Sequence, residues 1–337
     1  MIRCAIVGCG HIARKHIEAI RNTEGAELVA LCDTDMSRLN EFKLSVGVPV
    51  FTEMAEMLQM LPEIDLICIC TPSGIHARLA EQAARAGKHL IIEKPVSLTA
   101  EDGETIRQAV RYSGVKAAVV HPNRYRPAIR YLKWALDGGL LGKISHVNAT
   151  VRWNRSQAYY DQAPWRGTRA MDGGVLMNQA IHSLDLLLWM FGPAARVQAL
   201  ADTRLRRIET EDVAVAALRF ESGVLGVVEA ATTVYEHNLE ESISVFGENG
   251  YVVIGGATAN WIKHWKCSSM TPGEIDRVIQ RVEQDPYGIP GHQRIIEDMV
   301  NAIKDDRDPA VTVDDGIRAV QLVHDIIASA EREEIHT

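Results

Sequence analysis

Ile2-Arg3-Cys4-Ala5-Ile6-Val7-Gly8-Cys9-Gly10-His11-Ile12-Ala13 is a short apolar run followed by a glycine turn and the start of a helix. Gly8 permits a tight turn, Gly10 lets the main chain approach a pyrophosphate, and Ala13 allows the helix to pack closely on the strand. Free N–H groups and the dipole at a helix N-terminus favour negative charge. The segment therefore predicts a dinucleotide site. Two alternatives share its first half: a glycine turn that only reverses the chain, and a site for S-adenosylmethionine.

An acidic residue follows the next apolar run. Leu28-Val29-Ala30-Leu31-Cys32 predicts a second strand, and Asp33 stands directly after it. An acid at this place binds the ribose hydroxyls of NAD and repels the 2′-phosphate of NADP. We therefore expect NAD, with NADP less favoured. Arg38 weakens the sequence-based preference for NAD over NADP, because a guanidinium can stack on adenine or bind a phosphate.

The wider pattern predicts two domains. Strand-like and helix-like segments alternate over residues 1–120, which indicates a doubly wound parallel sheet, a Rossmann α/β domain. Over residues 121–337 several strand-like runs follow one another with few helices between them. This part predicts an α+β domain with an open, mostly antiparallel sheet. A long apolar helix is expected over residues 175–191.

Composition excludes several classes of protein. The 337 residues carry a net charge of −8, which argues against nucleic acid as the main partner. No run of eighteen uncharged apolar residues exists, so we expect no membrane span. The six cysteines fit neither a disulfide framework nor a zinc site, and the cytoplasm is the expected compartment. Metal-ligand spacing and the serine-nucleophile pattern Gly-x-Ser-x-Gly are also absent from the sequence, so no metal is expected.

A lysine marks the end of a later strand. In His89-Leu90-Ile91-Ile92-Glu93-Lys94-Pro95 a proline stops an apolar run, which places Lys94 at the carboxyl end of the strand. Ligands of parallel α/β sheets bind at that edge. The alternative is a lysine that only caps the strand and points to solvent.

Three segments, together with the glycine turn, resemble a known family. They are Cys70-Thr71-Pro72-Ser73-Gly74-Ile75-His76, Glu93-Lys94-Pro95, and the run from Asp172-Gly173-Gly174 to Asn178-Gln179-Ala180-Ile181-His182-Ser183-Leu184-Asp185. In order and spacing they resemble the glucose–fructose oxidoreductase / inositol dehydrogenase / MocA (Gfo/Idh/MocA) family. The resemblance implies an enzyme that oxidises or reduces a sugar or cyclitol carbon with a nicotinamide cofactor. It also implies a homodimer or homotetramer formed through the C-terminal sheet.

The resemblance assigns roles by motif. It implies that Lys94 is the catalytic lysine and His182 the catalytic histidine. Asn178 stands where many members carry aspartate, while Asp172 and Ala180 replace glycines of the same motif. The change at Asn178 puts in doubt a mechanism in which that carboxylate makes His182 more basic. The expected cofactor contacts are Gly8, Gly10, His11, Ile12, Asp33, Arg38, Thr71, Pro72, His76, Glu93, Lys94, Asn123, Trp165 and Arg166.

Within the family, one group shares further segments with this sequence. Gln157-Ala158-Tyr159-Tyr160-Asp161, Trp165-Arg166-Gly167-Thr168 and Tyr287-Gly288-Ile289-Pro290-Gly291-His292 are similar to segments of UDP-N-acetylglucosamine or uronate 3-dehydrogenases. Arginine suits phosphate, so several arginines near Tyr159 either meet a UDP pyrophosphate or are merely solvated. The expected substrate contacts are Asn178, Arg152, Tyr159, Arg166 and Asp185. Asp185 has a second interpretation as a contact that holds its helix.

The chemistry of alcohol oxidation suits these residue types. Histidine ordinarily titrates near neutral pH, so His182 suits general-base work, and a cation such as Lys94 stabilises a developing alkoxide. We therefore expect a secondary hydroxyl of a sugar to be oxidised, at C3 of a UDP-N-acetylamino sugar or its uronic acid. The alternatives are a free-sugar or myo-inositol-type dehydrogenase and a non-catalytic NAD(H) sensor.

Overall fold

The computed structural model describes residues 1–334 and divides into two compact units. The first unit is Met1–Pro122 with Ile289–Ile317, and the second is Asn123–Gly288 with the chain from Arg318 on. The expected division into 1–120 and 121–337 differs from this at one segment, because residues 289–317 return to the first unit. There the N–H of Val119 donates to the carbonyl of Val311 (3.1 Å), which ties this segment to the edge of the first sheet.

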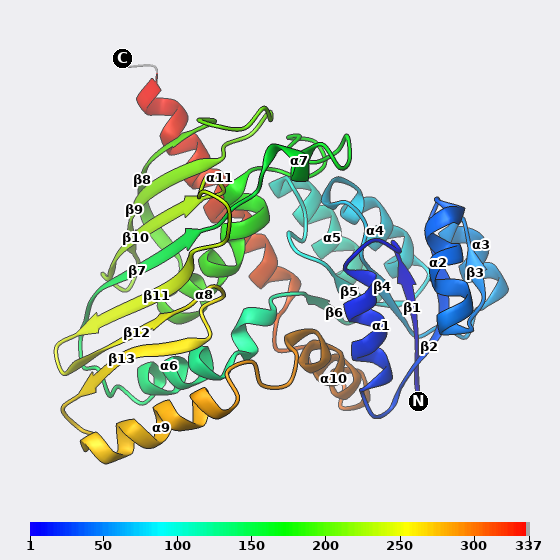
Figure 1. Cartoon of the computed structure of the whole chain (residues 1–337). Helices are drawn as coiled ribbons and strands as arrows, with labels where there is room; N and C mark the ends of the chain where they lie inside the picture. Colours follow the sequence, from blue (N-terminus) through cyan, green and yellow to red (C-terminus); the bar gives the residue numbers. More distant parts are fainter. Residues whose placement is uncertain (335–337) are drawn as a thin grey trace. The chain divides into compact units, whose positions relative to one another are not determined.

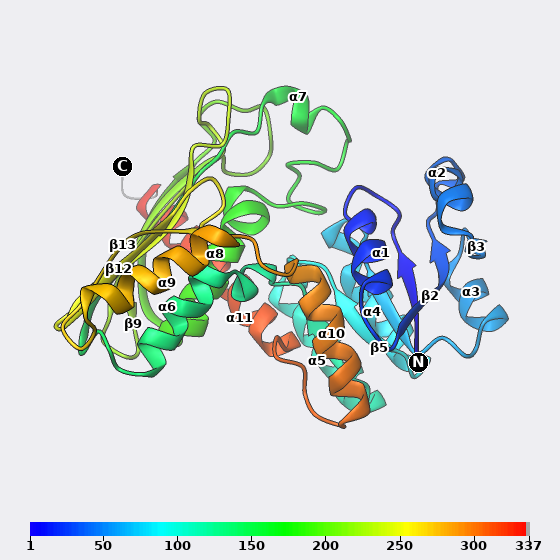
Figure 2. The ribbon, with the colours of Figure 1, turned by 60° about the horizontal axis from the view of Figure 1, so that its bottom comes forward.

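The first unit is a Rossmann α/β domain. Its six strands are all parallel in the order β3-β2-β1-β4-β5-β6, so the expected doubly wound sheet is confirmed. Helices flank the sheet, and α10 packs against α1 although the two are far apart in the chain (Figures 1 and 2). The elements are β1 Ile2–Val7, α1 Ala13–Arg21, β2 Ala26–Cys32, α2 Met36–Val46, β3 Val50–Phe51, α3 Met54–Met60, β4 Leu66–Ile69, α4 His76–Arg85, β5 His89–Ile92, α5 Ala100–Ser113, β6 Ala117–Val119 and α10 Gly291–Lys304.

The central strands of this sheet form the core of the unit. All four residues of β4 are buried, as are the last four of β1 and the last three of β5. A strand that is covered on both faces carries a continuous apolar run, which explains why these segments show no alternation in sequence. All six cysteines are free and buried.

The second unit contains a seven-stranded sheet in the order β13-β12-β11-β7-β10-β9-β8. One pair, β10 and β7, is parallel and the other pairs are antiparallel, which confirms the open, mostly antiparallel sheet. The elements are α6 Pro127–Asp137, β7 Ile144–Arg152, α7 Gln157–Tyr160, α8 Ile181–Phe191, β8 Ala194–Asp202, β9 Val213–Phe220, β10 Leu225–Ala231, β11 Glu240–Gly247, β12 Gly250–Gly255, β13 Trp261–Cys267 and α9 Pro272–Gln284. The unit boundary near residue 317 falls inside the last helix, α11 Val313–Glu334.

One face of this sheet is covered and the other is exposed. α8 packs against β7, and α6 packs against β12. Side chains alternate between buried and exposed along most of β9 and the first part of β10, as expected for a sheet with one covered face. The exposed residues of β8, β9 and β10 include Leu200, Val215, Leu225 and Val227. No helix among the described residues combines the length and the apolar character needed to cross a membrane.

Candidate functional site

The glycine turn between β1 and α1 has the geometry of a phosphate-binding turn. Gly8 has φ +98°, and a Cβ there would lie 2.6 Å from the carbonyl carbon of Cys70, so only glycine fits. A Cβ at Gly10 would meet no atom within 4 Å. The space beside Gly10 is therefore open to a ligand that approaches the main chain.

The N-terminus of α1 lacks a side-chain cap. Ile12 occupies the N-cap position and makes no capping hydrogen bond with its side chain. Helices usually satisfy their first N–H groups with a Ser, Thr, Asp or Asn cap. An apolar residue at this place leaves the positive end of the helix to an anion, and a pyrophosphate fits it.

Asp33 is held rigidly at the end of β2. Its Oδ2 accepts the N–H of Cys9 (2.7 Å) and its Oδ1 accepts the N–H of Asp35 (2.8 Å), and the residue is 8% exposed. Each carboxylate oxygen has a further lone pair for a ribose hydroxyl. Nη1 of Arg38 lies 3.8 Å from Oδ2 of Asp33, and Nε of Arg38 lies 3.5 Å from Oδ2 of Asp35. Because Asp33 and Asp35 both lie near Arg38, the end of β2 disfavours the 2′-phosphate of NADP.

The loops after β4 and β5 are joined by His76. Its Nδ1 lies 2.9 Å from the carbonyl of Pro95 and its Nε2 lies 2.9 Å from the carbonyl of Thr71. Burial lowers the pKa of His76, and the two carbonyls only partly oppose this effect. A neutral imidazole carries one N–H, so His76 donates to one carbonyl at a time. Its ring therefore fixes the loops that contain Thr71, Pro72 and Lys94.

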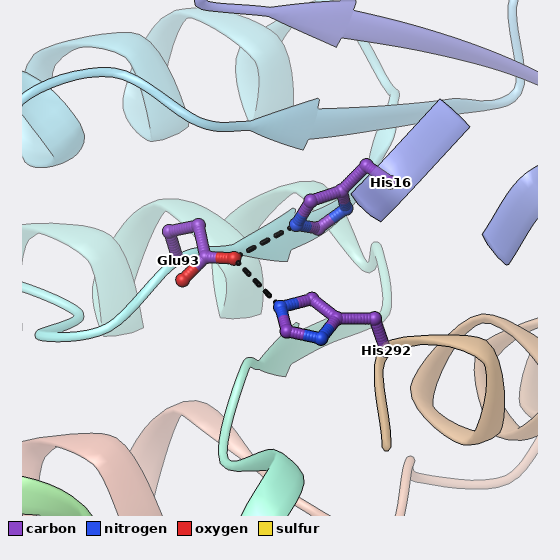
Figure 3. Close-up of side chains that lie close together, drawn as sticks. All are labelled: His16, Glu93 and His292. Carbon is purple, nitrogen blue, oxygen red and sulfur yellow. Dashed lines mark hydrogen bonds and ion pairs between the residues drawn. The ribbon is translucent and has the colours of Figure 1, made fainter. Parts of the chain in front are cut away.

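Glu93 points at two histidines. Its Oε1 lies 2.8 Å from Nε2 of His16 and 3.4 Å from Nε2 of His292 (Figure 3). Its Oε2 accepts the N–H of Lys94 (3.2 Å). Burial alone would raise the pKa of Glu93, but the bonds from His16 and His292 lower it well below its ordinary value. Sequence reasoning missed this arrangement. The available signal was Glu93 itself, because an acid at a buried strand end needs partners.

The second unit holds the expected catalytic helix. A π-helical turn over Leu176–Ala180 precedes α8, so Asn178 lies in this turn and His182 at the start of α8. Four residues span close to one turn in either helix type, so both side chains still share a face. The sequence predicted one α-helix here and did not predict the π turn. Such turns frequently occur at functional sites.

Asp172 and Glu211 hold the start of this helical segment. Asp172 accepts the N–H of Gly167 with Oδ2 (2.7 Å) and the amide of Asn178 with Oδ1. The Oε1 of Glu211 accepts the N–H of Leu176 (3.0 Å), and burial raises the pKa of Glu211. Asp172 therefore holds the side-chain amide of Asn178 in one orientation.

Several expected site residues have partners inside the second unit. Asp185 is 1% exposed and accepts two hydrogen bonds from Arg124 (2.6 and 2.8 Å). Asn123 donates to Glu241 (2.9 Å), also in a buried position. Arg152 binds the carboxylates of Glu229 (2.6 and 2.8 Å) and Glu240 (2.9 Å), which raise its pKa. We leave Asp185, Asn123 and Arg152 out of the proposed binding site, because these contacts give each a role in the fold.

Tyr159 and Arg166 lie together with two more residues. The Arg166 guanidinium lies 4.2 Å above the Tyr159 ring and 4.7 Å from the Trp165 ring, and it donates to the Tyr159 hydroxyl (2.5 Å). Arg155 lies over the same tyrosine at 5.3 Å. Nε of Arg166 is buried and has no hydrogen-bond partner within residues 1–334. Aromatic rings and arginines in this arrangement suit a base and a phosphate group.

Comparison with known proteins decides the family. The model of the oxidoreductase family with an NAD-binding Rossmann fold matches residues 2–121, and the GFO/IDH/MocA C-terminal domain model matches residues 129–253. The chain belongs to the Gfo/Idh/MocA family. It is therefore an NAD-dependent oxidoreductase, as its nucleotide turn and Asp33 predict.

Individual proteins are similar to this chain over different lengths. WlbA dehydrogenase from Bordetella pertussis, solved with NADH and UDP-GlcNAcA, is 37% identical with a TM-score of 0.94, over 98% of this chain and 96% of that one. WlbA from Chromobacterium violaceum, solved with the same two ligands, is 34% identical with a TM-score of 0.92, over 98% and 94%. D-apiose dehydrogenase from Paraburkholderia graminis is 32% identical over 67% of this chain and 60% of that protein.

Proposed function

We propose that this protein oxidises a secondary hydroxyl of a UDP-linked sugar, at C3 of a UDP-N-acetylamino sugar or its uronic acid, with NAD as acceptor. The observation that carries the proposal is the similarity to WlbA, which extends over nearly the whole length of both chains and includes complexes with NADH and UDP-GlcNAcA. The resemblance of residues 157–168 and 287–292 to nucleotide-sugar 3-dehydrogenases supports the choice of C3.

Lys94 and His182 carry the proton chemistry in this proposal. His182 accepts the proton of the hydroxyl, and the Lys94 ammonium stabilises the negative charge that develops on the oxygen. Bound NAD supplies the hydride acceptor. Asn178 does not titrate, so it orients a substrate hydroxyl or the imidazole and takes no proton. Its amide is held by Asp172, which fixes the direction in which it bonds.

Arg155, Tyr159 and Arg166 are proposed to receive the UDP part. Two guanidinium groups beside the Tyr159 ring suit a phosphate group, and Arg166 offers a donor at Nε. A matched pair of variants tests this role. Arg166→Ala should raise KM for a UDP-sugar about 10- to 100-fold, because a hydrogen bond to a charged group contributes ~1.5–3 kcal/mol. Arg204→Ala is the control, since Arg204 is a surface residue paired with Asp202.

A dehydrogenase of an unlinked sugar or polyol is the second candidate, supported by the similarity to D-apiose dehydrogenase. NADH absorbance during turnover of UDP-N-acetylglucosamine, its uronic acid, apiose and myo-inositol separates the two. The proposal requires clear preference for a UDP-linked compound. Preference for an unlinked one would select the second candidate, and NAD binding without any turnover would select a sensor.

A further inference from the structure

His16, Glu93 and His292 form a largely buried triad (Figure 3), and Glu93 directly precedes the expected catalytic lysine, Lys94. We propose that His16 and His292 position the Glu93 carboxylate and, through it, the main chain of Lys94, so that the two histidines are positioning residues for catalysis. This inference rests on the proposed role of Lys94. His16 comes from the first turn of α1, Glu93 follows β5, and His292 comes from the first turn of α10.

The contacts of the triad all converge on one carboxylate. Oε1 faces both Nε2 atoms at 2.8 and 3.4 Å, and the two imidazole rings meet edge to face with centroids 5.3 Å apart. His16 is 1% exposed and Glu93 is 6% exposed. A carboxylate buried to this degree is stable only when donors surround it. Oε2 is left to accept the N–H of Lys94, which fixes the direction in which the chain leaves β5.

The triad also joins Lys94 to the helix that receives the pyrophosphate. His16 lies one turn from the uncapped N-terminus of α1, and the same side chain reaches the residue before Lys94. α10 is held close by Gly291, where a Cβ would lie 2.6 Å from the carbonyl oxygen of Pro122. A shift of about 1 Å at a catalytic group can cost ~10²-fold in rate, so a rigid link of this kind has a kinetic consequence.

A bound metal is the alternative use of these three side chains. Among the side chains that the structure describes, they form the one His/Cys/Asp/Glu group whose ligand atoms all lie within 4.8 Å of one another. A histidine that binds metal through Nε2 carries its proton on Nδ1, and that N–H normally donates to a neighbour. Nδ1 of His16 is buried without such a partner in the described structure. Two imidazoles that each point Nε2–H at Glu93 fit this environment better.

The protonation of the triad follows from the same contacts. Burial lowers the pKa of His292, which keeps its imidazole neutral near pH 7, while Glu93 stays ionised because its pKa is well below the ordinary value. If one N–H donor is removed, burial raises the pKa of Glu93 relative to the native protein. Glu93 would then gain a proton at a higher pH. The other titratable groups that act on the triad are Lys15, Cys68, Cys70, His76 and Lys94.

Two amide variants of the full-length protein test the inference. In His292→Gln the side-chain amide N–H reaches the place of Nε2, whereas in His292→Asn it stops near the place of Nδ1. We expect His292→Asn to lower kcat about 10- to 100-fold and to move the acid limb of the pH profile toward higher pH. His292→Gln should restore most of kcat and the native acid limb. NAD affinity should change little in either variant.

The control is His89, at the opposite end of β5, where Nδ1 accepts the N–H of Lys116 (2.9 Å). His89→Asn should leave kcat and the pH profile unchanged. The inference would be overturned if native protein and both His292 variants had equal kcat, or if the Gln and Asn variants lost kcat equally. Stoichiometric zinc, iron or manganese, found by elemental analysis of the native protein, would also overturn it. Lys94→Ala separates this failure from failure of the proposed function, because full activity in Lys94→Ala refutes the role of the lysine itself.

Discussion

At the scale of single residues, the structure fixes the surroundings of Lys94 and His182, the two residues proposed to carry the chemistry. Lys94 follows a buried strand, is preceded by a buried carboxylate and is followed by a loop that His76 holds. His182 begins a helix whose preceding turn is fixed by Asp172 and Glu211. Rigid neighbours of this kind hold a reactive group in one geometry, which is how enzymes lower the entropic part of a barrier.

Lys94 and His182 should therefore respond differently from their neighbours. Lys94→Ala should lower kcat about 10²–10³-fold through loss of alkoxide stabilisation, and His182→Ala about 10²–10⁴-fold through loss of the base. Both variants should still bind NAD in a thermal-shift assay. Lys88→Ala, which changes a half-buried lysine that lies directly before the same strand and donates with Nζ to the carbonyl of Pro62 (2.7 Å), should turn over normally. Normal kcat in Lys94→Ala or His182→Ala would remove that residue from the mechanism.

Asp33 should set the cofactor preference. Asp33→Asn weakens the bonds to the ribose hydroxyls and the repulsion of a 2′-phosphate, so we expect NAD affinity to fall about 10-fold or more and the NADP/NAD ratio to rise. Asp35→Asn is the matched control, because Asp35 is also an acid beside Arg38 but is exposed. Calorimetric titration with both cofactors measures the ratio. An unchanged ratio in Asp33→Asn would contradict the assignment.

At the scale of secondary-structure elements, the two glycines of the turn between β1 and α1 have different expected roles. Gly8 is needed for the fold, and Gly10 for binding of the cofactor. Gly8→Ala places a Cβ against the main chain of Cys70 and Thr71 and forces a positive φ on alanine, which costs at least ~1–2 kcal/mol. Gly10→Ala places its Cβ in open space. We expect Gly8→Ala to lower the unfolding temperature of the protein without ligand. Gly10→Ala should keep that temperature but bind NAD more weakly; native NAD affinity in Gly10→Ala would show that no ligand approaches this turn.

Most elements of the first unit could be predicted from the sequence, because parallel strands are buried on both faces and stand out as apolar runs. In the second unit β13 and α9 were not predicted. β13 carries Lys263, His264 and Lys266 on its exposed positions, as edge strands often do, so its apolar pattern is weak. For α9 a sequence signal was present. Thr271 and Glu274 form a capping box at the start of the helix, and Pro272–Gln284 is amphipathic.

The candidate site was predictable only where a motif is continuous in the chain. Gly8, Asp33 and Lys94 stand at strand ends that the sequence shows directly. The partners of Glu93 come from α1 and α10, and the pairing of Asp172 with Asn178 depends on a π turn. No local pattern encodes which histidine reaches a given acid, because that depends on packing between elements distant in sequence.

At the scale of the whole molecule, the exposed face of the second sheet is a proposed contact between two copies of the chain. Leu200 pairs with Val215 across β8 and β9, and Val227 lies on the neighbouring strand with its side chain exposed. Exposed apolar patches of this kind often mark interfaces. Val227→Glu should shift the molar mass measured by light scattering toward the monomer, whereas Glu248→Ala should not. A native protein that is monomeric at micromolar concentration would contradict the proposal.

In the proposed reaction, the enzyme removes a hydride from C3 of a UDP-linked sugar. The most direct measurement uses UDP-N-acetylglucosaminuronic acid deuterated at C3, with NAD, and mass spectrometry of both products. One deuterium should appear in the reduced cofactor, and the sugar should lose its C3 deuterium and one hydrogen. Reduced cofactor without deuterium during turnover, or no turnover of the UDP-sugar while an unlinked polyol is oxidised, would contradict it.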